Sequence, residues 1–156
     1  MDVSLIFGII FTIIVISVVL VFGGEQIANL FGLSGEAQII KSIGNLQSKV
    51  DEIYRLAENS GEDFKLTFSK DYKLCFFSPS NPQRRLSAGW NPDSTVLYRI
   101  NQSGYNIWYF KGSDSASGTG KSIPYMSIPS TKNFCSTGGS EVYIVNRGNF
   151  VEVEPA

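Results

Sequence analysis

A run of 20 residues near the start of the chain, from Val3 to Phe22, consists almost entirely of aliphatic and aromatic side chains. Its interruptions are small and uncharged: Ser4, Gly8, Thr12 and Ser17. As a helix, this run would extend about 30 Å, the thickness of the hydrocarbon layer of a bilayer. A lone segment in lipid must satisfy its own backbone hydrogen bonds, so helix is the expected conformation. We therefore predict that residues 1–23 form a transmembrane helix or a helix in the core of a filament.

Two other interpretations of this run are less favoured. A cleaved secretory signal would normally carry Lys or Arg before the apolar stretch and a small-residue cleavage site after it, and neither is found. A buried helix of a soluble domain rarely contains so long an unbroken apolar run. The first basic residue after the run is Lys41, so the distribution of positive charge does not orient the helix across a membrane.

Residues 24–60 are predicted to form an amphipathic helical segment. Its apolar positions alternate in spacings of four and three, which is typical of one helix face. They are Ile39, Ile43, Leu46, Val50, Ile53 and Ala57. This stripe could pack on a neighbouring chain as a coiled coil or on a sheet of the same chain. It covers only about three heptads, which favours the sheet.

Glycines separate the apolar and amphipathic parts of this helical region: Gly23, Gly24, Gly32 and Gly35. Each one costs about 1 kcal/mol in a helix interior relative to alanine. We therefore expect a break or kink between Gly23 and Gly35. The turn-forming residues 59–61 are expected to end the second helical part.

Residues 61–156 are predicted to be a β-rich head domain. Alternating apolar and polar residues, separated by turn formers, indicate three hairpins and no second helix. The expected pairs are 64–68 with 72–77, 95–100 with 105–110, and 141–145 with 150–153. The predicted fold class is therefore α+β, with a long N-terminal helix packed on an antiparallel sheet or a small sandwich.

The chain contains two cysteines, Cys75 and Cys135, and no histidine. A structural zinc site normally requires four Cys or His ligands, which argues against a metal. A disulfide closing a loop of about 60 residues is favoured over a reactive thiol, and it would be worth about 4 kcal/mol. Disulfides persist in oxidising compartments, so the head domain is expected to lie outside the cytoplasm.

Three further motifs carry possible chemistry. Asn101, Gln102 and Ser103 form an N-glycosylation triplet on an expected hairpin tip. The sequence 118–122 resembles a phosphate-binding loop, but Ser115 stands where its first glycine belongs and Pro124 prevents the helix that should follow. Five aromatic residues could form a glycan-binding or peptide-binding surface, although core packing is the favoured interpretation: Trp90, Tyr98, Tyr105, Trp108 and Tyr109.

These observations argue against several classes of function. The formal net charge is −1, without the basic excess that nucleic-acid binding requires. Because the chain has no histidine, no pair of a catalytic nucleophile and a general base can be identified in the sequence. A hydrolase that uses a dyad of Ser122 with a distant lysine is the weakest of the functional hypotheses. We expect no enzymatic activity, no cofactor, no metal and no bound nucleotide or nucleic acid. The expected partners are membrane lipid and other copies of the chain, through the N-terminal helix.

An apolar helical half, an amphipathic half with a heptad-like stripe and then an antiparallel sheet domain follow one another along the chain. This order resembles the type IV pilin-like proteins, particularly the archaeal ones, across the whole chain. The resemblance implies an apolar helix that first lies in the membrane and then packs in a filament core. It also implies an amphipathic half packed on the head domain, and a head that faces solvent at the cell surface. An anchored binding module for a glycan or peptide is the alternative.

Overall fold

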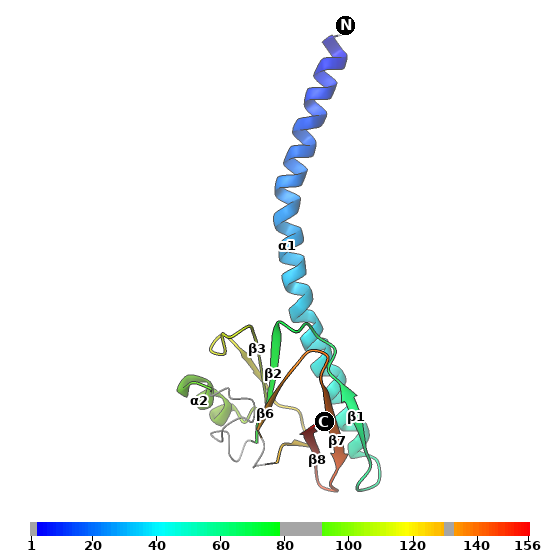
Figure 1. Cartoon of the computed structure of the whole chain (residues 1–156), viewed down its shortest axis with the longest axis vertical. Helices are drawn as coiled ribbons and strands as arrows, with labels where there is room; N and C mark the ends of the chain where they lie inside the picture. Colours follow the sequence, from blue (N-terminus) through cyan, green and yellow to red (C-terminus); the bar gives the residue numbers. More distant parts are fainter. Residues whose placement is uncertain (1–2, 79–91, 130–132) are drawn as a thin grey trace. The chain divides into compact units, whose positions relative to one another are not determined.

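The structure is a computed structural model that describes residues 3–78, 92–129 and 133–156. The chain divides into two compact units, Met1–Ala37 and Gln38–Ala156. The elements follow one another as α1 (Val3–Tyr54), β1 (Gly61–Lys65), β2 (Tyr72–Phe76), α2 (Ser94–Ser103), β3 (Ile107–Lys111), β4 (Thr119–Lys121), β5 (Met126–Ser127), β6 (Phe134–Thr137), β7 (Glu141–Asn146) and β8 (Val151–Pro155) (Figure 1). The α+β class expected from the sequence is confirmed.

Helix α1 is assigned from Val3 to Tyr54 without interruption, which differs from the break expected between Gly23 and Gly35. The cost of glycine in a helix is only about 1 kcal/mol per residue, which a long apolar helix can tolerate. The division between the two compact units nevertheless falls close by, after Ala37. The helix also ends before the expected turn: Asn59 has a positive φ of 68°, and Gly61 already belongs to β1.

The strands form two four-stranded, largely antiparallel sheets, and not the single sheet that was one of the two arrangements expected. The first has the order β1-β7-β8-β5 and the second the order β4-β3-β2-β6. All pairs are antiparallel except β5 with β8, which is parallel. The hairpin expected around residues 146–149 is confirmed, since β7 pairs with β8.

The first expected hairpin is wrong, because β1 pairs with β7 while β2 pairs with β3 and β6. The segment 66–71 crosses between the sheets instead of reversing within one. Leu66 exchanges backbone hydrogen bonds with the distant turn at Gly139 and Ser140. Leu66 and Phe68 are buried in the core. The two apolar side chains of the crossover are thereby removed from water.

The second expected hairpin is also wrong, because its first half forms helix α2. Asp93 caps the helix, and its carboxylate accepts a hydrogen bond of 2.9 Å from the Val96 amide. Gly104 adopts the left-handed conformation that commonly ends a helix. Val96 and Ile100, four residues apart, provide the buried face. Cap, spacing and terminal glycine are all legible in the sequence, although β-branched residues favoured a strand.

Two hydrophobic clusters lie on opposite faces of the second sheet. Along β2 and the residue that follows it, Leu74 and Phe76 belong to a cluster shared with α1 and the first sheet, whereas Cys75 and Phe77 belong to a cluster shared with α2. Successive strand residues point to opposite faces, which explains this division. Within the unit 38–156, α2 and α1 therefore cover different faces of the second sheet (Figure 1).

Candidate functional site

The apolar stripe of α1 lies in the core of its own head domain. Its first five positions are at most 2% exposed, and they share one cluster with side chains of both sheets: Ile39, Ile43, Leu46, Val50 and Ile53. Ala57, the sixth predicted position, lies beyond the end of α1 and is exposed. The stripe is therefore already occupied within one chain, and it offers no face for a coiled-coil partner.

Ser42 is a polar residue within this buried helix face that the periodicity did not single out. It is fully buried, and its hydroxyl accepts a hydrogen bond of 3.2 Å from the Thr67 amide. Thr67 lies on the segment that crosses between the two sheets. Ser42 therefore holds the crossover against the helix. No spacing rule could have found this contact, because its partner lies 25 residues away.

The C-terminal end of α1 is capped by Asn146, the last residue of β7. Its side-chain amide donates to the carbonyl oxygens of Ile53, Tyr54 and Leu56 at 3.0, 3.2 and 2.9 Å. Its Oδ1 accepts from the Gly148 amide at 2.7 Å. The last carbonyls of a helix have no partner within the helix. One distant side chain thus satisfies the helix end and ties it to the first sheet.

We expect Asn146→Ala to lower the free energy of unfolding by about 2 kcal/mol, because it removes three hydrogen bonds from buried and partly buried carbonyl groups at the helix end. Urea unfolding followed by the fluorescence of the buried Trp108 measures the effect. Asn149→Ala changes an exposed residue of the same hairpin and is the matched control. Equal stability of the two variants would contradict the capping role.

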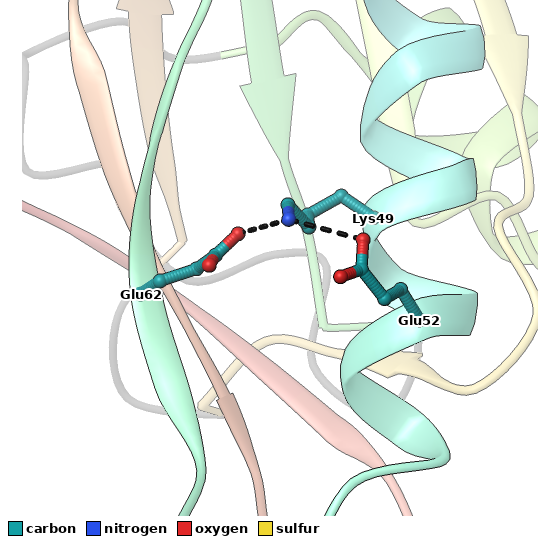
Figure 2. A network of polar contacts seen from close by, with 3 residues as sticks. All are labelled: Lys49, Glu52 and Glu62. Carbon is teal, nitrogen blue, oxygen red and sulfur yellow. Dashed lines mark hydrogen bonds and ion pairs between the residues drawn. The ribbon is translucent and has the colours of Figure 1, made fainter.

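An ion-pair network links α1 to β1 (Figure 2). The Lys49 ammonium lies 3.0 Å from a carboxylate oxygen of Glu52, one turn along the helix, and it also pairs with Glu62 of β1. Hydrogen bonds to Glu62 and then to Glu52 raise the pKa of Lys49 above its ordinary value. Both carboxylates remain substantially exposed, so solvent and salt screen the network.

We expect Lys49→Met to lower the melting temperature slightly. A raised lysine pKa stabilises the folded state fully below the unfolded pKa of about 10.4, and the contribution disappears as the pH rises through the folded value. The difference between wild type and variant should therefore be constant from pH 7 to about pH 10 and shrink above it. Lys65→Met is the control, as an exposed lysine on β1. A difference that grows above pH 10 would refute the ion-pair explanation.

The predicted disulfide is confirmed: Cys75 and Cys135, which are 60 positions apart in the sequence, are bonded. The two residues are direct partners on the neighbouring strands β2 and β6. Cys75 is fully buried beside Trp108 and the helix α2. Within the described residues no free cysteine is present, so this part of the chain offers no reactive thiol.

The glycine-rich motif of 118–122 has a packing explanation. A side chain at Gly118 would overlap the Trp108 indole, and one at Gly120 would overlap the Tyr105 ring. The Trp108 indole N–H donates to the Ser115 carbonyl at 3.0 Å, which fixes the ring under this loop. The motif forms strand β4 and not a loop leading into a helix. Its glycines admit aromatic rings, and no phosphate needs to be invoked.

The aromatic residues considered as a binding surface are dispersed. Trp108 is 1% exposed and Tyr109 is also buried, whereas Tyr105 is partly buried. Tyr98 is exposed on α2. Trp90 lies outside the described residues. Core packing therefore accounts for Trp108 and Tyr109, and a broad aromatic platform is not assembled from the four described rings.

Asn101 lies on α2 and not on the hairpin tip expected from the sequence. Asn101, Gln102 and Ser103 are all exposed, so the triplet is on the surface. Asn106, which the sequence did not single out, is instead buried: its amide donates to the carbonyls of Ile123 and Met126 at 2.9 and 3.2 Å. It fixes the connection from β4 to β5 against β3.

The N-terminal unit exposes large apolar side chains. Phe11, Ile13, Val15 and Ile16 are between 43 and 62% exposed. The Ser17 hydroxyl donates to the Ile13 carbonyl at 2.8 Å, so this polar group is satisfied within its own helix. Among the helices whose residues the structure describes, none was found that is long and apolar enough to cross a membrane.

The described residues contain no group of three or more Cys, Asp or Glu side chains that could hold a metal ion. Comparison of the chain with protein-family models, with curated proteins and with solved structures gave no significant match.

Proposed function

We propose that the chain is a structural protein of the cell surface: a pilin-like subunit of a filament or a surface protein held by its N-terminal helix. The observation that carries the proposal is the contrast between the two parts of α1. The stripe from Ile39 to Ile53 is buried on the head domain. The side chains of Phe11, Ile13, Val15 and Ile16 are exposed. Removal of such apolar surface from water is favourable by about 25 cal/mol per Å², so this segment requires hydrocarbon or a neighbouring copy.

The membrane stage of this proposal rests on the sequence of Val3–Phe22. The Cys75–Cys135 disulfide supports a head outside the cytoplasm, because such bonds persist in oxidising surroundings. After Asp2 the first charged residue is Glu25, and most of the charges lie on the head, which suits exposure to water. A helix whose N-terminal part is apolar and whose C-terminal part is packed in a charged head is suited to assembly into a filament, with the apolar parts together and the heads in water. The relationship to archaeal pilin-like proteins, which the resemblance implies, is part of this same proposal.

Electron microscopy of filaments sheared from producing cells, with mass spectrometry of their subunit under non-reducing conditions, tests the proposal. Ile13→Lys places a charge in the apolar segment and should abolish assembly while the head still folds. Tyr98→Lys changes an exposed residue of the head by the same substitution and is the control. Recovery of the chain from membranes alone would select the anchored form. Recovery from neither membranes nor filaments would overturn both forms.

The anchored binding module remains the second hypothesis, and it draws less support from aromatic residues than the sequence suggested. Trp108, one of its two tryptophans, is buried. A ligand surface would have to be built from other groups.

A further inference from the structure

Strand β4 lies at the end of its sheet, with β3 on one side and no partner strand on the other among the described residues. It is short, and it is exposed at Thr119 and half-exposed at Gly120 and Lys121. An edge strand presents unpaired backbone N–H and C=O groups, onto which another extended segment can add. Neither the head's hydrophobic clusters nor the proposed assembly helix uses this edge.

Two surface hollows flank this edge, one on each face of the sheet. The first, of about 190 Å³, lies on the α1 side and is lined by Ile40, Ile43, Tyr109, Thr119, Gly120 and Lys121. Its wall is mainly apolar, and Ile40 is 50% exposed there. An unbranched or aliphatic side chain fits such a space.

The second hollow, of about 240 Å³, lies on the α2 side of the same strand. Tyr105, Trp108, Gly118 and Gly120 form its floor, and Arg99 with Ser103, four residues apart on α2, form its rim. Thr119 also lines this hollow. The space directly over Gly118 and Gly120 is taken by the Trp108 and Tyr105 rings, so a side chain of a neighbouring strand would lie beside these rings, next to Arg99 and Ser103.

The alternation of β4 explains why the hollows lie on opposite faces. Thr119 and Lys121 are the partners of Tyr109 and Ile107, which belong to the cluster on the α1 side. Gly120 is the partner of Trp108, which belongs to the cluster on the α2 side. Successive residues of an added strand would enter the two hollows in turn.

The charges indicate the chemistry of the occupant. Arg99 lines the α2-side hollow and Lys121 lines the α1-side hollow, and none of the described residues lining either hollow is acidic. A guanidinium at the rim favours a carboxylate, which it can bind through two parallel hydrogen bonds. Backbone pairing would supply affinity, and the two hollows would supply specificity.

We propose that the edge of β4 binds an extended peptide segment of a partner protein by strand addition, with an aliphatic side chain in the α1-side hollow and an adjacent acidic side chain beside Arg99. This interaction surface goes beyond the proposed assembly role, since it lies on the head and does not involve the apolar segment. It also gives the binding-module hypothesis a specific site.

The test uses the full chain in detergent micelles and the capped peptide VEVEVE, which alternates the two required side-chain types. Calorimetry should detect binding at peptide concentrations up to about 1 mM, as expected for a short strand with few contacts. Amide resonances of Thr119, Gly120 and Lys121 should shift. The peptide VKVKVK should bind at least about tenfold more weakly, because its ammonium groups would face Arg99. A peptide with proline at its centre should not bind, because proline removes a ladder hydrogen bond.

Two variants and a control show which side chain of the peptide each hollow binds. Arg99→Glu should weaken VEVEVE about tenfold and strengthen VKVKVK, and Ile40→Lys should weaken both peptides. Arg55→Glu reverses an exposed charge just after the end of α1 that lines neither hollow, and it should leave binding unchanged. The proposal is overturned by absence of binding, by equal binding of the acidic and basic peptides, or by shifts away from β4. A change of oligomeric state in Arg99→Glu without peptide would instead assign the edge to a second copy of the chain, which also overturns it.

Discussion

Replacement of both cysteines, Cys75→Ala with Cys135→Ala, is expected to lower the free energy of unfolding of the head by about 4 kcal/mol. The bond closes a loop of 60 residues, and in the chain-entropy model such a loop restricts the unfolded ensemble by that amount. Alanine is chosen because Cys75 is fully buried, and serine would place a hydroxyl in an apolar site. A typical domain has only about 5–15 kcal/mol of stability, so the loss is a large fraction of the total.

Urea unfolding under non-reducing conditions, followed by tryptophan fluorescence, measures this difference. The wild-type protein should lose the same stability when a reductant is added, whereas the double variant should be insensitive to the reductant. A wild-type protein whose fully reduced and oxidised forms unfold at the same urea concentration would contradict the prediction.

Leu46→Ala is expected to cost about 2–5 kcal/mol, because it removes a fully buried side chain and leaves a cavity between α1 and the sheets. The matched control is Ile40→Ala on the same helix, at a position that is half exposed. The control should change stability by less than about 0.5 kcal/mol, as exposed positions usually do. Thermal unfolding at several protein concentrations provides the measurement.

The concentration dependence separates the two partners first considered for the stripe. If Leu46 packs within its own chain, the loss of stability is the same at every protein concentration. If it packs against another chain, the melting temperature of the wild type rises with concentration and the effect of Leu46→Ala varies with it. The second outcome would contradict the intramolecular core described above.

Local patterns predicted those parts of the fold that depend on near neighbours in sequence. The spacing from Ile39 to Ile53 indicated a helix face, and the turn at 146–149 indicated the hairpin of β7 and β8. Two cysteines without histidine favoured the disulfide. Each of these predictions rested on a few residues and on one simple pattern. The packing of the rest of the chain could therefore not easily change the outcome.

The pairing of distant strands could not be predicted in this way. Strand β1 pairs with β7 and β2 with β6, and no periodicity specifies which distant strand an apolar alternation will meet. Helix α2 was missed for a different reason: β-branched residues at 95, 96 and 100 outweighed the cap at Asp93 and the glycine at 104. Strand propensity depends strongly on context, and here packing on the second sheet decided the outcome.

The interactions of the candidate sites were the least accessible to sequence reasoning. Asn146 caps a helix that ends 92 residues earlier, and Asn106 fixes a connection through carbonyl groups that any residue could supply. Backbone acceptors carry no sequence signature. The hollows beside β4 likewise depend on α1, α2 and two strands converging, which only the folded chain reveals.

The disulfide also determines how far the protein can be stretched. A chain pulled from its two ends transmits tension through every residue outside the covalent loop, and the segment between Cys75 and Cys135, which are 60 positions apart, remains a closed ring. At about 3.3–3.6 Å per residue, roughly 200 Å of contour length is thereby withheld from extension. A surface protein that bears mechanical load would therefore yield over a shorter distance and keep much of the second sheet's sequence together, ready to refold when the load is released.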